Sequence, residues 1–207
     1  FSADDASHGR ELWKSNGSDA GTVLVADGVP GVFGSFPQSI TSNFGAVYFS
    51  ADGGKAGREL WRSDGSAPGT TIIKDIRAAG SANPRNLIVA NGLLYFQATD
   101  DLTGQEVWVS NGTVPGTVLL VDIQPGVDYS DPSDFRVVGN LLLFAANDGV
   151  HGKELWAYAL PEVDLTAPVI TILGPNPKLV ARIKAADLLL AQTGQLPRDA
   201  ARGVRPG

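Results

Sequence analysis

Residues Arg58–Gly65 read Arg-Glu-Leu-Trp-Arg-Ser-Asp-Gly, and close copies of this phrase occur three more times along the chain. The tryptophans of the four copies lie 48, 47 and 48 residues apart, at Trp13, Trp61, Trp108 and Trp156. A repeat of roughly 40–50 residues with several short strand-like runs is typical of propeller blades. The sequence therefore predicts an all-β tandem repeat of about four units of 47–48 residues.

Each complete unit is predicted to form a four-stranded antiparallel sheet. In the second unit, strand-like runs at 39–44, 46–51, 58–63 and 70–76 are separated by Gly, Asn and Asp, which favour tight reversals. Leu60 and Trp61 are neighbours, so their side chains point to opposite faces and both faces must be covered. This favours a β-propeller, or a fragment of one, over a sandwich, with a linear solenoid of sheets as an alternative. The residues expected to have structural roles are Leu12, Trp13, Gly17, Leu60, Trp61, Gly65, Trp108, Gly112, Leu155 and Trp156.

Three regions are expected along the chain. Residues 1–160 form the repeat region, residues 161–177 a linker or edge strand, and residues 178–207 a tail. The tail is expected to contain a short helix over 179–191, followed by a disordered basic segment. The first unit lacks its first strand and the fourth unit lacks its last, so residues 167–173 are expected to pair as the outer strand of the fourth unit. Self-association through the remaining edge strands is also expected.

Charge and composition exclude several classes of protein. The net charge is −6, and residues 175–207 contribute 6 − 2 = +4, so the repeat region carries −10, which disfavours nucleic acid as a partner. No apolar run approaches the ~18 residues of a membrane helix, so no membrane span is expected. The chain has neither Cys nor Met, and Phe1 aligns with Phe49 inside a repeat. We expect from this that the chain is a processed, truncated or partly sequenced product, and that any signal peptide was lost with the missing segment.

The repeat phrases resemble a known family. Phe49–Asp52, Arg58–Ser66 and Pro68–Thr70 are similar to the bacterial ELWxxDGT repeat, and the resemblance covers residues 1 to about 160. Membership implies a secreted or cell-surface bacterial protein with a β-propeller fold and no established catalytic residues. The departures are Asn16 and Asn111 in place of the turn Asp, and Val107 in place of Leu, as the sequence shows.

Two weaker resemblances follow the repeats. Residues 165–175 are similar to the opening of bacterial immunoglobulin-like surface domains. Residues 184–192 resemble the helix of a dockerin-like module. The calcium site of a dockerin needs an upstream run of alternating Asp and Asn ligands, and residues 174–178 contain no such run.

The loops between the second and third predicted strands are rich in acidic residues. Carboxylate oxygens on loops can bind calcium, and the candidate ligands are Asp5, Glu11, Asp52, Asp101 and Asp148. The favoured interpretation is turn chemistry, in which Asp accepts backbone N–H bonds and the Glu of the motif pairs with Arg or Lys. No cofactor is therefore expected, and calcium is the alternative.

The four tryptophans have two interpretations. Exposed aromatic rings can stack on sugars, so Trp13, Trp61, Trp108 and Trp156 are candidate ligand-binding residues. Each ring follows Leu or Val in a strand whose two faces are both covered, so core packing is the favoured interpretation.

The predicted function is a binding or structural scaffold without catalysis, whose partner is an extracellular protein or a glycan. One alternative is a multivalent carbohydrate-binding lectin with one site per blade. A second is a polysaccharide-acting enzyme, in which acids from separate loops converge. The enzyme is disfavoured because no single distinctive cluster interrupts the similarity of the units.

Overall fold

The computed structural model describes residues 1–43, 45–78, 80–161 and 180–183, and in these ranges the chain is almost entirely β. One 3-10 turn, η1 (Gly54–Ala56), is the only helical element in the described ranges, so the predicted absence of α-helix from residues 10–160 is confirmed there. The strands are β1 (Ser2–Asp5), β2 (Gly9–Lys14), β3 (Val23–Ala26), β4 (Gln38–Asn43), β5 (Ala46–Asp52), β6 (Arg58–Ser63), β7 (Thr71–Lys74), β8 (Arg85–Ala90), β9 (Leu93–Asp100), β10 (Gly104–Ser110), β11 (Thr117–Val121), β12 (Ser133–Val138), β13 (Leu141–Asn147), β14 (Lys153–Ala159) and β15 (Val180–Ile183).

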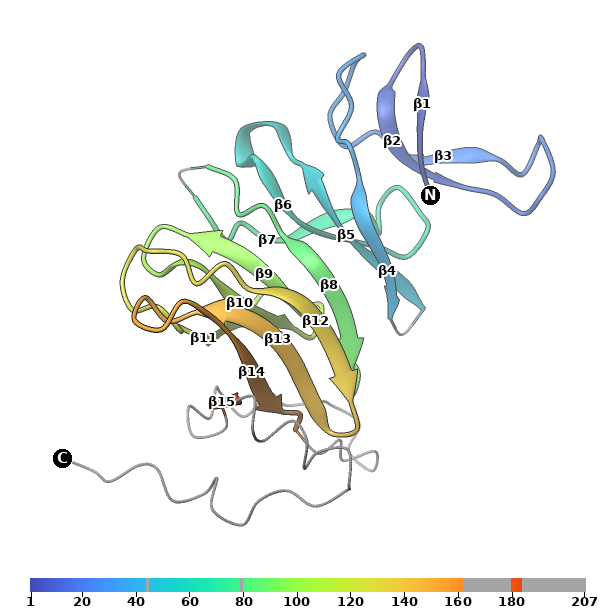
Figure 1. Cartoon of the computed structure of the whole chain (residues 1–207). Coiled ribbons are helices and arrows are strands. Elements are labelled where there is room, and N and C mark those ends of the chain that lie inside the picture. The colour runs from blue at the N-terminus through green and yellow to red at the C-terminus, as the bar shows by residue number, and fades with distance from the viewer. Residues whose placement is uncertain (44, 79, 162–179, 184–207) are drawn as a thin grey trace.

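These strands form four antiparallel sheets, one for each copy of the repeat (Figure 1). The first sheet has the order β1-β2-β3, and the next two are meanders, β4-β5-β6-β7 and β8-β9-β10-β11. The fourth sheet has the order β12-β13-β14-β15. The predicted four-stranded antiparallel unit is confirmed, because turn-forming Gly, Asn and Asp residues end the strands close to the predicted positions.

The outer strand of the fourth sheet differs from the expectation. Residues 180–183 pair with β14 as β15, with Tyr158 opposite Val180 and Leu155 opposite Ile183. Residues 180–183 thus occupy the edge of β14 at which residues 167–173 were expected to pair, and the predicted helix over residues 180–183 is wrong. The physical reason is that β14 offers unpaired backbone N–H and C=O groups, and pairing with them outweighs local helix propensity. Residues 184–191, the rest of that predicted helix, lie outside the described residues, as do 162–179 and the expected disordered tail.

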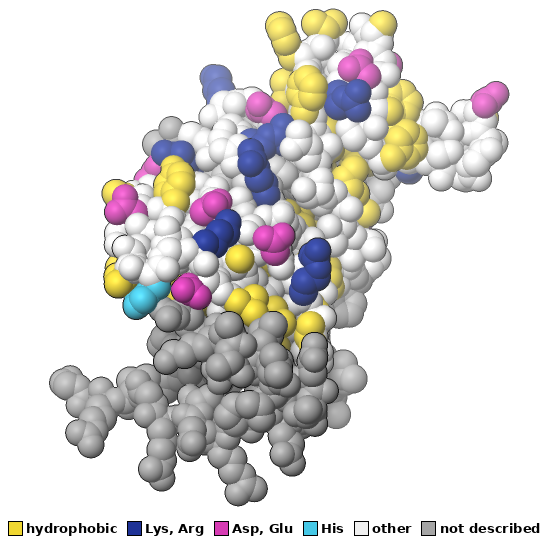
Figure 2. Space-filling model, in the orientation of Figure 1, with side chains coloured by type: hydrophobic (Ala, Val, Ile, Leu, Met, Phe, Trp, Pro, Cys, Tyr) yellow, Lys and Arg dark blue, Asp and Glu magenta, His cyan; other side chains and the backbone are white. Residues whose placement is uncertain are grey.

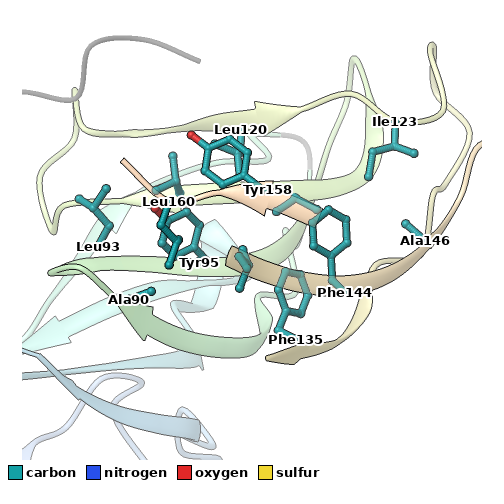
Figure 3. Packing of buried hydrophobic residues seen from close by; sticks show 13 residues of the cluster. Ala90, Leu93, Tyr95, Leu120, Ile123, Phe135, Phe144, Ala146, Tyr158 and Leu160 are labelled. Atoms are coloured by element: carbon teal, nitrogen blue, oxygen red, sulfur yellow. The ribbon is translucent and has the colours of Figure 1, made fainter. Parts of the chain in front are cut away.

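The sheets stack face to face, and apolar side chains of neighbouring sheets pack together in each gap between them. Leu12 and Val25 of the first sheet meet Phe49, Ala51 and Trp61 of the second. The gap between the second and third sheets holds, among others, Tyr48, Leu60, Ile73, Leu94, Phe96 and Trp108. In the third gap, Tyr95, Leu120, Phe135, Phe144 and Tyr158 pack together (Figure 3). Both faces of the second and third sheets are thus covered, as the adjacent Leu and Trp predict.

The first strand of each complete sheet has a recurring distortion. Strands β4, β8 and β12 lie side by side along one border of the stack (Figure 1). The pairing register of each with its neighbour shifts at a bulge. A residue with left-handed φ sits in each bulge: Ser39 at 55°, Asn86 at 56° and Asp134 at 57°. A bulge increases the local twist, so its repetition gives the three sheets the same curvature along this border.

Candidate functional site

The Glu of the repeated phrase is a buried carboxylate that holds the segment leading to the next sheet. Glu59 on β6 has no exposed surface. Its two carboxylate oxygens accept backbone N–H bonds from Ile76 and Ala82, each at 3.0 Å. Both donors lie between β7 and β8, in the crossover from the second sheet to the third. The carboxylate therefore satisfies buried amides that have left one sheet and not yet entered the next.

The same arrangement occurs in the other two crossovers. Glu11 accepts N–H bonds from Val29 at 3.3 Å and Ser35 at 2.7 Å, and also the Ser35 hydroxyl. Glu106 accepts four bonds, which come from the N–H groups of Ile123 at 3.0 Å, Gln124 at 3.3 Å and Ser130 at 3.3 Å, and from the Ser130 hydroxyl at 2.6 Å. We call Glu11, Glu59 and Glu106 the crossover glutamates.

Two of these carboxyl groups have a raised pKa. Burial raises the pKa of Glu59 to about 7, while its backbone N–H donors act in the opposite direction. Burial likewise raises the pKa of Glu106 to about 7, opposed by the Ser130 hydroxyl and by backbone N–H donors. A carboxyl group with a pKa near neutrality is a candidate general acid or base. Both groups, however, are fully buried and already bonded to the crossover, so a substrate has no access to them.

The expected pairing of the motif Glu with Arg or Lys is wrong. The crossover glutamates bond to backbone amides, and no ion pair in the described ranges involves them. Arg58 instead donates to the carbonyl oxygens of Phe36 and Ser50, both at 3.1 Å. The reason is burial, since fixed backbone N–H groups satisfy a buried carboxylate better than the long side chain of Arg or Lys does.

A glycine allows the crossover to approach the motif. Gly104 directly precedes the phrase that contains Glu106, and its φ is +70°. A Cβ at this position would lie 2.2 Å from the carbonyl oxygen of Asp128 in the crossover. Gly57 faces Gly80 in the same way, at 2.6 Å. Only glycine leaves room for the two backbones, so this position and the crossover glutamate act together.

The Ser-Asp-Gly part of the phrase forms a self-contained turn. The Oδ1 atom of Asp64 accepts bonds from the N–H and the hydroxyl of Ser66, at 2.9 and 2.6 Å. The Ser63 hydroxyl lies 2.7 Å from the Thr70 hydroxyl, and Gly69 donates its N–H to Ser66 at 3.1 Å. The Ser66 bonds lower the pKa of Asp64.

Equivalent bonds form at Asn16 and Asn111. Asn supplies the same Oδ1 acceptor as Asp, which explains the exchange of Asp and Asn at this position. The turn glycines Gly17, Gly65 and Gly112 have φ of 92°, 88° and 84°, in keeping with their expected structural role.

Two of the four tryptophans lie in the core. Trp61 and Trp108 are 8% and 5% exposed and pack in the gap on the side of the preceding sheet. Trp61 stacks on Phe49 at 6.2 Å between ring centres, and its Nε1 donates to the carbonyl oxygen of Ala51 at 3.0 Å. Trp156 repeats this bond to Ala146 at 3.1 Å, but its ring is only half-buried, like that of Trp13. Sugar stacking on Trp61 or Trp108 would require the sheets to separate.

The calcium candidates have other partners in the structure. Asp5 accepts N–H bonds from Ser7 and His8 and meets the His8 ring at 2.9 Å. Asp148 makes the corresponding turn with His151, and these bonds lower its pKa. The other candidates bond to neighbouring groups: Asp52 to the Gly54 N–H, Asp101 to Arg77, and Glu11 to its crossover. In the parts of the chain that the structure describes, no three His, Cys, Asp or Glu side chains form a group that could hold a metal ion.

An open groove of about 760 Å³ lies between the first and second sheets. Apolar walls come from Leu12 and Val25 of the first sheet and from Ile40 and Val47 of the second. The turn glycine Gly65 and its neighbours border the groove. The sequence analysis did not identify this groove. Its walls come from two different sheets, so no local sequence pattern indicates it.

No family model matches the chain, and no curated protein matches it. A chain from a structural study of two prolyl endopeptidases is similar to 72% of this chain, with 18% sequence identity and a TM-score of 0.48. This chain spans 21% of the length of that chain. This similarity is too low to support a functional argument. No helix within the described residues is long and apolar enough to span a membrane.

Proposed function

We propose that this chain is a β-propeller segment that acts as a secreted or cell-surface binding scaffold without chemistry of its own. The observation that carries the proposal is the use of the motif's polar side chains. In three copies of the repeat, the Glu holds a crossover, and the Ser, Asp or Asn, and Thr side chains close a turn. Groups that are already bonded within the fold serve to build a surface rather than to react with a substrate.

The arrangement of the sheets supports the propeller part of the proposal. Three complete meanders place their first strands β4, β8 and β12 together, while their later strands spread outward (Figure 1). The second and third sheets pack both of their faces against neighbouring sheets, as in the blades of a propeller. In the described ranges, no apolar cluster joins the first sheet to the fourth. The propeller is thus proposed as an open array of blades.

The surface also suits a binding role. Acidic and basic side chains are interspersed over the face turned to the viewer in Figure 2, with hydrophobic side chains between them. The crossovers expose large apolar residues, among them Phe33 at 77% and Val127 at 68%. Loops held by a rigid sheet scaffold commonly carry binding residues. The resemblance to ELWxxDGT repeats adds the expectation of an extracellular bacterial setting, in which the partner is an extracellular protein or a glycan.

A direct test compares the scaffold with the lectin and the enzyme. The purified chain is applied to a glycan array and incubated with polysaccharide and peptide substrates. We expect no glycan-dependent binding and no hydrolysis. Glycan binding that Trp13→Ala or Trp156→Ala abolishes without changing the melting temperature would establish the lectin instead. Hydrolysis that co-purifies with the chain and disappears in one acidic-residue variant of unchanged stability would establish the enzyme.

A further inference from the structure

Two crossovers carry the same kind of exposed tip. Residues 30–34, between β3 and β4, read Pro-Gly-Val-Phe-Gly, and residues 125–129, between β11 and β12, read Pro-Gly-Val-Asp-Tyr. The φ angles of Gly31 and Gly126 are 104° and 105°, so the two segments turn in the same way. We call residues 30–34 and 125–129 the crossover tips.

Each crossover tip is fixed at both ends by one carboxylate. Glu11 and Glu106 accept N–H bonds from the residues directly before and directly after the tip. The tip backbone also packs against a sheet, since a Cβ at Gly9 or Gly104 would lie 2.6 or 2.7 Å from the carbonyl oxygen of the tip valine. A segment held in this way has little conformational freedom left to lose when it binds a partner.

The residue after each tip is tied to the following sheet. The carbonyl oxygen of Ser35 accepts the N–H of Asp52 on β5 at 2.7 Å, and that of Ser130 accepts the N–H of Asn147 on β13 at 2.8 Å. Each tip therefore lies between two sheets that the structure describes, and these neighbours set its exposure.

The crossover tips present large apolar side chains to solvent. Val32 and Phe33 are 65% and 77% exposed, and Val127 and Tyr129 are 68% and 52% exposed. The equivalent segment of the middle crossover, residues 77–81, reads Arg-Ala-Ala-Gly-Ser and has no large apolar residue. Figure 2 shows hydrophobic side chains gathered at the top of the view, around the β3–β4 crossover of Figure 1. Adjacent apolar side chains that a rigid loop holds in solvent add nothing to the core, and grouped exposure of this kind marks interaction sites.

The loops around the crossover tips are acidic. The three crossovers and the loops that join β1 to β2, β5 to β6, β9 to β10 and β13 to β14 lie at the end of the stack where β4, β8 and β12 begin (Figure 1). They contain two basic residues, Lys55 and Arg77, and seven Asp, so their net charge is 2 − 7 = −5. The seven Asp are Asp27, Asp75, Asp101, Asp122, Asp128, Asp131 and Asp148. The turns at the opposite end of the described sheets contain two Asp and no Lys or Arg, so the acidic charge is concentrated around the tips.

We propose that the crossover tips are the contact points of a docking surface for a second protein that presents basic and apolar side chains. This inference rests on the proposed scaffold role, and it names the surface and the chemistry of the partner. Val32 with Phe33, and Val127 with Tyr129, supply two apolar anchors on loops that are ordered before binding. The surrounding carboxylates supply the charge that steers a basic partner onto these anchors and rejects an acidic one.

Charge distinguishes this partner from two other occupants. Apolar loop tips also insert into lipid surfaces, but membranes that contain anionic lipids carry negative charge, which an end with a net charge of −5 repels. A second copy of this chain carries the same charge at the same end, so two copies placed tip to tip repel each other. The occupant is therefore a separate, basic protein.

The test selects partners by their chemistry. The full chain is immobilised and exposed to a displayed library of random peptides, and the selected peptides are titrated into the chain by calorimetry. We expect the selected peptides to carry a net positive charge and at least one large apolar residue. The double variant Phe33→Ser, Tyr129→Ser is expected to bind them at least roughly tenfold more weakly, since a few large anchors carry most of the binding energy at such sites.

Val114 supplies the matched control. It is 58% exposed and lies in the turn between β10 and β11, at the opposite end of the sheet. Val114→Ser removes an exposed apolar side chain like those of the tips, and it should leave peptide binding unchanged. Raising the salt concentration should weaken binding to the native chain, because salt screens exposed charges.

The carboxylate that holds the second of the two tips provides another arm. Glu106→Gln leaves Val127 and Tyr129 in place but removes one of the acceptor oxygens that fix the tip. We expect several-fold weaker peptide binding in this variant, and unchanged binding in Glu154→Gln, which alters the same position of the fourth sheet. If Glu106→Gln does not fold, the double serine variant and Val114→Ser still decide the result.

Several results would overturn the proposal. Selected peptides that are acidic or uncharged would refute the basic partner, and equal binding by the native chain and the double serine variant would refute the tips. A library that yields no binding peptide would count equally against the surface. Vesicles of phosphatidylcholine and phosphatidylglycerol that bind the native chain but not the double serine variant would identify a lipid surface instead. A dimer in sedimentation that the double serine variant loses would identify a second copy.

This proposal and the scaffold role fail separately. Failure at the tips leaves the glycan and hydrolysis results untouched, because those assays do not depend on Phe33 or Tyr129. A positive glycan or hydrolysis result would reject the scaffold role even if peptides bound to the tips.

Discussion

Replacement of Glu59 by glutamine tests the role of the crossover glutamates most directly. The variant keeps the size of the side chain but leaves one acceptor oxygen where the native carboxylate offers two, each bonded to one buried N–H at 3.0 Å. One of the amides of Ile76 and Ala82 then faces an NH₂ group. An unsatisfied buried donor costs about 1–3 kcal/mol, so we expect Glu59→Gln to lower the free energy of unfolding by about 2 kcal/mol. Glu59→Ala removes both acceptors, and we expect a loss of about 4 kcal/mol.

The fourth copy of the motif supplies a matched control. Glu154 occupies the same position in the repeat but is half-buried, and no hydrogen bond in the described ranges uses its carboxylate. We expect Glu154→Gln to change the free energy of unfolding by less than about 0.5 kcal/mol. Urea denaturation gives the three free energies, and hydrogen exchange reports whether the amides of Ile76 and Ala82 become less protected. An equal loss in Glu59→Gln and Glu154→Gln would refute the crossover role.

Three further predictions follow from the same contacts. Burial raises the pKa of Glu59 and Glu106 in the folded protein to about 7 from an ordinary value of 4.5. A raised folded-state pKa contributes stability that is fully present below pH 4.5 and is lost as the pH rises through 7. The free energy of unfolding of the native protein should therefore exceed that of the double glutamine variant by more at pH 5 than at pH 8, as urea titrations at both pH values would show. Trp61→Ala should destabilise the fold by ~3–5 kcal/mol and Trp13→Ala by clearly less, because the side chain of Trp61 is buried and that of Trp13 is only half-buried; equal changes in melting temperature would contradict this. Asp64→Asn should be nearly neutral, whereas Asp64→Ala should cost about 1 kcal/mol through loss of the Oδ1 acceptor, and thermal unfolding of the pair is the check.

The position of the crossover glutamates could have been anticipated in part. Glu59 lies two residues before Trp61, so the two side chains share one face of the strand. The adjacent Leu and Trp imply that this face is covered, and a covered carboxylate needs hydrogen-bond donors. The donors themselves are 17 and 23 residues away along the chain, in a crossover of irregular backbone. No local pattern indicates which of its amides will face the carboxylate.

The sequence by itself determined the repeat, the strands and their turns. These depend on short-range effects: alternating apolar residues form strands, and Gly, Asp and Asn reverse the chain through bonds to residues two or three positions away. The turn at Asp64 is an example, since all its partners lie within the same copy of the motif.

Tertiary structure alone decided the features that depend on distant partners. Residues 180–183 form β15 because the edge of β14 is open to them, although their own sequence favours a helix. The crossover glutamates bond to amides that only the stacking of sheets brings within reach. The walls of the groove, Leu12 and Val25 on one side and Ile40 and Val47 on the other, come from two sheets that only their stacking brings together. Burial and backbone pairing act across the whole fold, and the residues that complete them are adjacent in space but not in sequence.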